Sequence, residues 1–314
     1  ELSTGVTAES DEFSVEETPE GDITFPDTFD ENLGNTGEIV VNINNYDGAV
    51  YVQFGDEDSS NYQTLLEVED TSDSGNVTIE YDTTEVGTSA FSLADSDDSL
   101  EHLYSTDGID APLEPGHSYS LTAGIVANAT EGNVTDKTDG SSFYLNEREG
   151  MNGLESATAP AADDLDDAVV TETDEIANGD QLLGVIEAND VFALLSEDDD
   201  ADSLASNDVN ISVTEVNPGA NAEPETWSNI DGVGTEAADG PELTGDDIEI
   251  VETDEENGTV LFALNSYDFL ENNEAYELNV SLEEGNVLLS GDEDESVSTE
   301  FSLAQPELEL DDSN

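Results

Sequence analysis

The sequence predicts an all-β protein made of two tandem β-sandwich domains preceded by an extended N-terminal arm. Apolar and polar residues alternate in many short runs, the period-2 pattern of strands with one buried face. Turn residues separate these runs at short intervals, as is typical of sandwiches. The chain of 314 residues is long enough for two domains of about 100–200 residues each.

Two of the expected strands begin with a tyrosine that follows a turn. Pro115 and Gly116 precede Tyr119, and Tyr276 has the same place in the stretch 269–282. In immunoglobulin-like (Ig-like) sandwiches, such a tyrosine forms a corner by bonding through its hydroxyl to upstream backbone. We therefore expect structural corners at Tyr119 and Tyr276 and an Ig-like fold in both domains.

The predicted organisation starts with an arm at residues 1–20. Its apolar residues alternate with polar ones, and no nearby turn pairs it with a second strand; the apolar positions include Leu2, Val6, Phe13 and Val15. Two interpretations stay open: a disordered leader, or a strand that adds to a sheet edge of its own subunit or of a neighbour.

The first domain is expected at residues 21–150. Its strands are predicted at 22–25, 38–44, 49–54, 62–68, 76–81, 119–125 and 142–146. Residues 82–112 are irregular and acidic, with Phe91 and Leu93 as core residues. Glycine, alanine and proline then predict a linker at 151–165.

The second domain is expected at residues 166–314 and repeats the pattern of the first. Residues 179–185 correspond to 37–43, residues 258–265 to 75–82, and Phe301 to Phe143. A short helix is expected within 189–204, and the last strand at 298–303. The largest inserted loop, at 216–246, contains Trp227.

The charge of the chain is extreme. Lys137 and Arg148 are the only lysine and arginine, against 81 acidic residues, for a net charge of −79. In dilute buffer this charge opposes the compact state, whereas at 1 M salt the Debye length falls to about 3 Å. A folded protein adapted to molar salt fits both the charge and the regular strands, and a halophilic archaeon is the expected source.

The same composition excludes several partners. No basic patch is present to neutralise phosphates, so nucleic acid and anionic membrane surfaces are excluded. No apolar run approaches the length of about 18 residues that membrane insertion requires. The absence of cysteine excludes disulfides and thiolate chemistry. The chain starts at Glu1 rather than Met, as expected of a secreted chain whose signal has been removed.

Asparagine residues in Asn-x-Ser/Thr sequons indicate a secreted glycoprotein carrying N-linked glycans. They are Asn76, Asn128, Asn133, Asn210, Asn257 and Asn279. Asn128 and Asn133 lie in one expected loop and are the favoured sites.

Clusters of carboxylates could bind a structural calcium ion, because Ca²⁺ takes six to eight oxygen ligands. The candidate ligands are Asp56, Asp58, Asp95, Asp97, Asp98, Asp198, Asp200, Asp292 and Asp294. None of these clusters has the spacing of an EF-hand. Each one therefore has two open interpretations, a calcium site and a solvated face that tolerates salt. Cations from the medium could also bridge acidic subunits.

Catalytic constellations are not apparent, and we expect no enzyme. His102 and His117 are the only histidines, and His117 belongs to the turn before Tyr119. Carboxylates are too numerous for an acid–base pair to be distinguished. Trp227 either stacks on a sugar in a solvent-facing loop or anchors its loop to its own domain.

Several stretches resemble the haloarchaeal cell-surface glycoprotein family, which includes the S-layer glycoproteins. They are residues 91–98, 112–121, 144–148, 159–160 and 175–188. The resemblance implies an exported, glycosylated, Ig-like protein of the cell surface. This sequence departs from many longer members because it lacks a threonine-rich stalk and a C-terminal membrane anchor.

Together these observations predict a structural subunit of an extracellular filament or sheath of a halophilic archaeon. The arm would add as a strand to the neighbouring subunit and generate a head-to-tail homo-oligomer. The alternative is a non-polymeric or S-layer-associated surface glycoprotein with adhesive or carbohydrate-binding loops, in which Trp227 faces solvent around a pocket.

Overall fold

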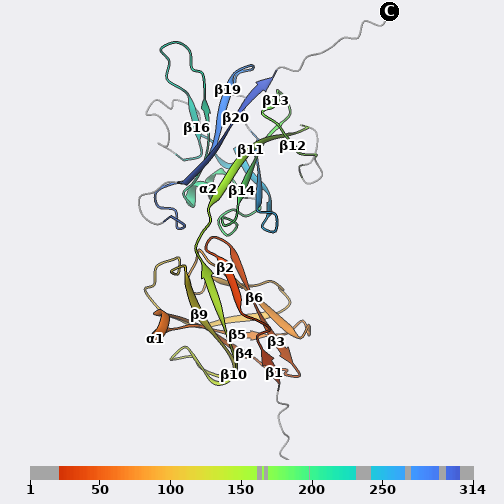
Figure 1. Ribbon diagram of the computed structural model, residues 1–314. Helices are drawn as coiled ribbons and strands as arrows, with labels where there is room; N and C mark the ends of the chain where they lie inside the picture. Colours follow the sequence, from red (N-terminus) through yellow and green to blue (C-terminus); the bar gives the residue numbers. More distant parts are fainter. Residues whose placement is uncertain are drawn as a thin grey trace, which may run out of the picture.

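The computed structural model describes residues 21–160, 165, 169–197, 199–230, 242–265, 270–289 and 295–304. These residues form two β-sandwiches placed end to end, and the chain crosses from the first to the second between β10 and β11 (Figure 1). The predicted arm lies outside the described residues.

The first sandwich pairs a four-stranded sheet, in the order β1-β3-β6-β7, with a six-stranded sheet, in the order β2-β10-β9-β4-β5-β8. The strands of the smaller sheet are β1 (Asp22–Thr24), β3 (Thr36–Asn44), β6 (Asn76–Asp82) and β7 (Phe91–Leu93). Those of the larger sheet are β2 (Phe29–Asn32), β4 (Val50–Asp56), β5 (Tyr62–Glu69), β8 (Ser99–Ser105), β9 (His117–Asn128) and β10 (Asn133–Asn146). One helical turn, α1 (Glu57–Ser60), joins β4 to β5.

The second sandwich pairs two five-stranded sheets, in the orders β12-β11-β14-β18-β17 and β13-β20-β19-β15-β16. The first sheet contains β11 (Met151–Ala159), β12 (Thr171–Glu172), β14 (Gln181–Ala188), β17 (Ile248–Asp254) and β18 (Thr259–Leu264). The second contains β13 (Glu175–Ala177), β15 (Val209–Glu215), β16 (Thr226–Ser228), β19 (Ala275–Leu282) and β20 (Glu295–Ala304). The helices are α2 (Ala201–Ser206) and the 3₁₀ turn η2 (Gly245–Asp247).

Both sandwiches have the strand order of an Ig-like fold, and the predicted fold class is confirmed. In each sandwich, the first strand (β1 or β11) lies in one sheet, and a later short strand (β2 or β13) lies in the other sheet. This short strand runs parallel to the last strand of the sandwich: β2 beside β10 and β13 beside β20. The central pairs β3–β6 and β14–β18 occupy equivalent positions. The internal repeat expected from the sequence therefore corresponds to equivalent strands.

Alternation along the strands builds the core of the first sandwich. Ile39, Val41 and Ile43 are buried on β3 while their neighbours are more exposed. Phe54 is fully buried at the centre, where its ring lies within 5.0–6.2 Å of the rings of Tyr62, Tyr81, Phe91, Tyr119 and Phe143. This aromatic cluster packs the tyrosine corner against both sheets.

The predicted linker at 151–165 is wrong over Met151–Ala159, which forms β11 and pairs with β14. Its small residues suggested a linker, but Ala157 and Ala159 are buried and pack with Leu183 and Ala263. Leu165 and Val170, which follow β11 in the chain, pack against the same cluster. The second domain therefore begins at β11.

The irregular segment expected at 82–112 contains two strands, β7 and β8. Phe91 is buried as expected, and it lies on β7. β8 was not recognised because Leu100, Glu101, His102 and Leu103 do not alternate cleanly between apolar and polar. It extends the larger sheet by one strand and forms its outer edge.

Candidate functional site: the domain junction and the open sheet edge

Both tyrosine corners are present, with opposite hydrogen-bond polarity. The Tyr119 hydroxyl donates to the carbonyl oxygen of Glu114 at 2.9 Å. The Tyr276 hydroxyl accepts from the backbone N–H of Glu271 at 2.7 Å. Burial, assisted by the charge of Glu114, raises the pKa of Tyr119 to about 12. Both hydroxyls therefore stay protonated and tie the loop before the strand to the sandwich.

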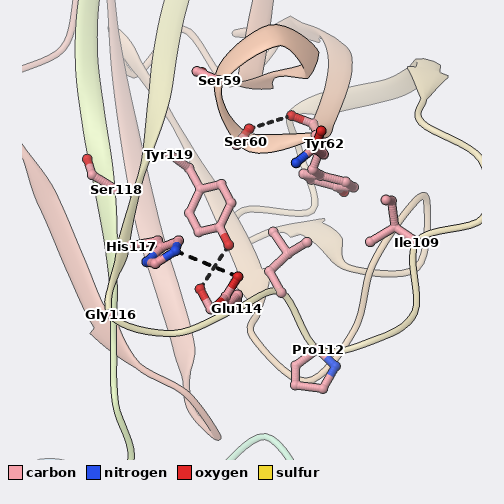
Figure 2. Close-up of a pocket in the computed structure, with 12 residues that line it drawn as sticks. Ser59, Ser60, Tyr62, Ile109, Pro112, Glu114, Gly116, His117, Ser118 and Tyr119 are labelled. Atoms are coloured by element: carbon pink, nitrogen blue, oxygen red, sulfur yellow. Dashed lines mark hydrogen bonds and ion pairs between the residues drawn. The ribbon is translucent and has the colours of Figure 1, made fainter.

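A pocket of about 460 Å³ lies beside the Tyr119 corner (Figure 2). The Ser60 hydroxyl at its rim donates to the carbonyl oxygen of Tyr62 at 2.9 Å. His117 Nε2 lies 3.6 Å from a Glu114 carboxylate oxygen, and both side chains are mostly exposed. Most of the polar groups labelled in Figure 2 thus bond to one another or to backbone, and His117 is an exposed residue at the start of β9. This pocket shows no nucleophile held by a base.

The junction between the two sandwiches is organised around Arg148, which lies between β10 and β11. Its Nε is 3.1 Å from Asp190 Oδ1, and its Nη1 is 3.0 Å from Glu295 Oε2. Asp190 is fully buried, and Arg148 is only 11% exposed. One of the two formal cations of the chain is therefore shared between two carboxylates of the second sandwich.

Backbone N–H groups donate further hydrogen bonds to these two carboxylates. Asp190 accepts from the N–H groups of Glu149 and Gly150. Glu295 accepts from the N–H of Met151 at 2.6 Å. Charge-assisted hydrogen bonds of this kind are about twice as strong as neutral ones. They fix the direction in which the chain leaves the first sandwich and enters the second.

A loop of the first sandwich fits directly against the second. The Asn35 amide donates to the Asn189 carbonyl oxygen at 2.9 Å, and the Ala193 N–H donates to the Gly34 carbonyl oxygen at 2.8 Å. Gly34 has a φ of +109°, and a Cβ there would lie 2.4 Å from the Asp190 carbonyl oxygen. Only glycine fits this conformation and this close contact. The junction is therefore a packed interface.

An acidic cleft of about 410 Å³ opens beside this interface, with Glu31 on one sandwich and Glu255 and Glu256 on the other. Burial, followed by the charges of Glu31 and Glu38, raises the pKa of Glu255 to about 7. Carboxylates from both sandwiches are thus brought together in a cleft whose lining residues include no lysine or arginine. Within the part of the chain that the structure describes, no three acidic, histidine or cysteine side chains form a metal-binding group.

The predicted calcium ligands mostly stabilise local turns. Asp56 caps α1 by accepting from the N–H groups of Asp58 and Ser59. Asp200 caps α2 in a capping box with Ser203.

The other predicted ligands do not converge on one another either. Asp95 accepts from the N–H of Asp97, and Asp98 accepts from the N–H of Ser72. Asp198, Asp292 and Asp294 lie outside the described residues. A structural calcium ion remains a prediction, because the described candidate ligands do not form a metal-binding group.

The sequons differ in exposure. Asn76 and Asn257 are exposed, whereas Asn128, Asn133 and Asn279 are partly buried. Asn210 is only 2% exposed, and its amide donates to Ser281 and Glu283. Asn210 is therefore the least accessible of the six sequon asparagines, because β15 is covered on both faces over Val209–Val213, and a glycan there stays a prediction.

Trp227 lies on β16 and is 4% exposed. Its ring packs edge-on against Tyr276 at 6.3 Å. The interpretation in which Trp227 faces solvent to bind sugar is therefore wrong, because the indole fills the core beside the second tyrosine corner.

The sheet edges differ in how much backbone they leave unpaired. β8 is a seven-residue edge strand that pairs only with β5 in the described structure. The predicted contact residues Leu2, Val6, Phe13 and Val15 lie outside the described residues. Lys137 is exposed on β10, where the pairing with β9 is repeatedly shifted in register.

Sequence reasoning missed the junction, although one signal was available. Arg148 is one of two formal cations in a chain with 81 acidic residues, and so scarce a residue type is informative. Its partners Asp190 and Glu295 could not be identified, because they lie 42 and 147 positions away and resemble many other acidic residues.

Comparison with known proteins identifies relatives among haloarchaeal surface proteins. Residues 15–123 match a family described as a domain of unknown function (DUF7827). A cell surface glycoprotein of Haloferax gibbonsii is 28% identical over 98% of this chain and 36% of the relative. Cell surface glycoproteins 1 and 2 of Haloarcula hispanica are 27% and 25% identical over 68% and 99% of this chain. The chain spans about a third of the length of the Haloferax gibbonsii relative.

These relatives confirm the resemblance expected from the sequence and the expected location at the cell surface. A solved marsupial T cell receptor aligns over 90% of this chain and 74% of its own, with 10% identity and a TM-score of 0.22, too low to compare folds. No helix among the described residues is long and apolar enough to cross a membrane.

Proposed function

We propose that this chain, a homologue of haloarchaeal cell surface glycoproteins, is a structural subunit of an extracellular filament or sheath. Residues 1–16 of one subunit add as a strand to a sheet of the next subunit. Such a head-to-tail contact does not close on itself, so it generates an open polymer.

The observation that carries the proposal is the combination of an alternating segment with an open sheet edge. An edge strand presents a row of unpaired N–H and C=O groups that can pair with another chain. β8 presents such an edge, and residues 2–8 and 13–15 alternate apolar and polar side chains, with a polar break at 9–12 between them. Backbone hydrogen bonds supply affinity in strand addition, and alternate side chains supply register.

The domain junction supports a structural role. Arg148, Asp190 and Glu295 join the two sandwiches through buried ion pairs. A subunit that transmits mechanical load needs such a junction, whereas independent binding modules do not. In the corner pocket, the hydroxyls of Ser60 and Tyr119 donate to backbone carbonyl oxygens, which also favours a non-enzymatic role.

Removing residues 1–16 from the chain tests the proposal. We expect the intact protein to form polymers in molar salt and the shortened protein to sediment as a monomer, as seen by electron microscopy and analytical ultracentrifugation. Substituting Leu2, Val6, Phe13 and Val15 together by serine should act like the deletion. The matched control substitutes Ser3 and Thr7, on the face opposite Leu2 and Val6, by asparagine and should keep the polymer. Polymers formed by the shortened protein would contradict strand addition by this segment.

The second candidate function is a non-polymeric or lattice-associated surface glycoprotein, and the names of the relatives favour it. Its binding loops would not use Trp227, which is buried. An intact protein that stays monomeric in molar salt, and that binds carbohydrate on an array, would support this candidate over the first.

A further inference from the structure

We infer that β8 is the acceptor edge of the assembly and that its occupant is the segment Leu2–Ala8 of a second copy of this chain. The inference rests on the proposed function and names the surface that strand addition uses. It follows from the availability of the edges, their position in the sheet and the distribution of charge.

β8 is the edge with the most unpaired backbone. It pairs with β5 from Thr64↔Ser105 to Glu69↔Ser99, and no strand formed by the described residues lies on its other side. In the described structure, no backbone-to-backbone hydrogen bond outside this pairing involves Leu100–Ser105, and the Tyr104 carbonyl oxygen accepts from the Thr64 hydroxyl of β5 at 2.8 Å. Since backbone groups in a strand alternate in direction, about half of them point away from β5.

The other edges are short or covered. β17 is equally long, but Asp200 bridges to Glu249, and the Ile250 N–H donates to the Asp199 carbonyl oxygen. The remaining edge strands have two to four residues: β1, β2, β7, β12, β13 and β16. The part of β10 that β2 leaves unpaired carries Lys137 and shifted register, two features that discourage strand pairing.

The position of β8 favours a neighbour as the donor. β2 and β8 lie at opposite ends of the same sheet, and β1, which follows the segment, lies beside the β2 end. To reach its own β8, the segment would have to cross a sheet about 24 Å wide, at about 4.8 Å per strand spacing. A neighbour placed side by side brings donor and acceptor edges together. Because the two edges differ, the contact repeats in one direction.

Charge distribution matches the segment to the edge. Acidic residues make up 81 of 314 positions, yet Leu2–Ala8 contains none and β8 contains only Glu101. Both stretches are seven residues long. Pairing them avoids the repulsion that most other strand pairs of this chain would suffer. Hydrogen bonds between backbones also survive the molar salt that screens ion pairs.

Cysteine cross-linking of the full chain tests the inference, since the natural sequence has no cysteine. One copy carries Glu101→Cys, activated as a mixed disulfide so that it does not react with itself. The other copy carries a single cysteine placed in turn at each position from Leu2 to Ala8. The two are co-assembled in molar salt, and disulfide-linked dimers are measured on non-reducing gels. Thr135→Cys, on the exposed part of β10, is the matched control edge.

We expect cross-linking to Glu101→Cys with a period of two along the segment, at least tenfold above the Thr135→Cys control. Polymers that lack this cross-link, or that cross-link preferentially to Thr135→Cys, would contradict the assignment of β8 as the acceptor edge. They would not contradict strand addition itself. If a chain that carries both cysteines forms the disulfide within itself at every dilution, the donor strand comes from the same subunit, which would contradict a neighbouring subunit as the donor. Absence of any polymer would overturn the proposed function and this inference together.

Discussion

Arg148 is the residue on which the relation between the two sandwiches depends. Its guanidinium contacts the buried Asp190 and the partly buried Glu295. Removing one partner of a buried ion pair leaves an uncompensated charge, which costs about 3–5 kcal/mol. The acidic surface adds to this cost, because only one further formal cation exists in the chain.

Arg148→Gln should therefore lower the free energy of unfolding by about 3–5 kcal/mol, as measured by denaturant unfolding in molar salt. Lys137→Gln removes the same charge from an exposed position and should change stability by less than about 0.5 kcal/mol. Equal effects of the two substitutions would show that total charge matters and that the junction does not.

Glu255 should make the stability of the junction depend on pH. Its pKa in the folded protein is about 7, against an ordinary value of 4.5, so the folded protein holds this proton more tightly than the unfolded chain. Stability from this group is fully present below about pH 4.5 and is lost as pH rises towards about 7. Unfolding measured across this window should show the loss, and Glu255→Gln should reduce it. Glu284→Gln is the control, and an identical slope in Glu255→Gln would contradict the assignment.

At the scale of elements, β11 shows where the fold differs from the prediction. Ala157 is fully buried against Leu183 and Ala263, although its surroundings resemble a linker. Ala157→Leu should destabilise the protein by about 1–3 kcal/mol through overpacking, as measured by thermal or denaturant unfolding. Ala222→Leu, in an exposed turn, should be nearly neutral. A neutral effect of Ala157→Leu would contradict the close packing of β11 and would favour the interpretation of this segment as a linker.

Much of the fold could be predicted because each half-buried strand leaves a periodic pattern in its own residues. The strands around Ile39 and Tyr119 and both corners follow from such local patterns. β11 and β8 could not be predicted, since small residues and irregular alternation say little about distant strands. Their positions depend on pairing with β14 and β5.

The site was less predictable than the fold for the same reason. Asn210 matches a sequon, but its burial depends on Ser228 and Ser281 from other strands. Trp227 lies in a proline-rich segment, yet it packs on Tyr276. The ion pairs of Arg148 join residues 42 and 147 positions apart. Such contacts depend on tertiary structure and have no local signature.

At the scale of the whole molecule, the chain carries a net charge of −79, and the proposed assembly must overcome this repulsion. Salt screening reduces the repulsion, and a nearly uncharged segment paired with a nearly uncharged edge avoids part of it. Rigid coupling through Arg148 would then pass the orientation of each subunit on to its neighbours.

Electron cryomicroscopy of the intact protein assembled in molar salt tests the central claim most directly. We predict an open filament of side-by-side subunits in which density continues from residue 21 of one subunit to β8 of the next. Monomers under these conditions, or a polymer in which β8 faces solvent along its length, would contradict the account.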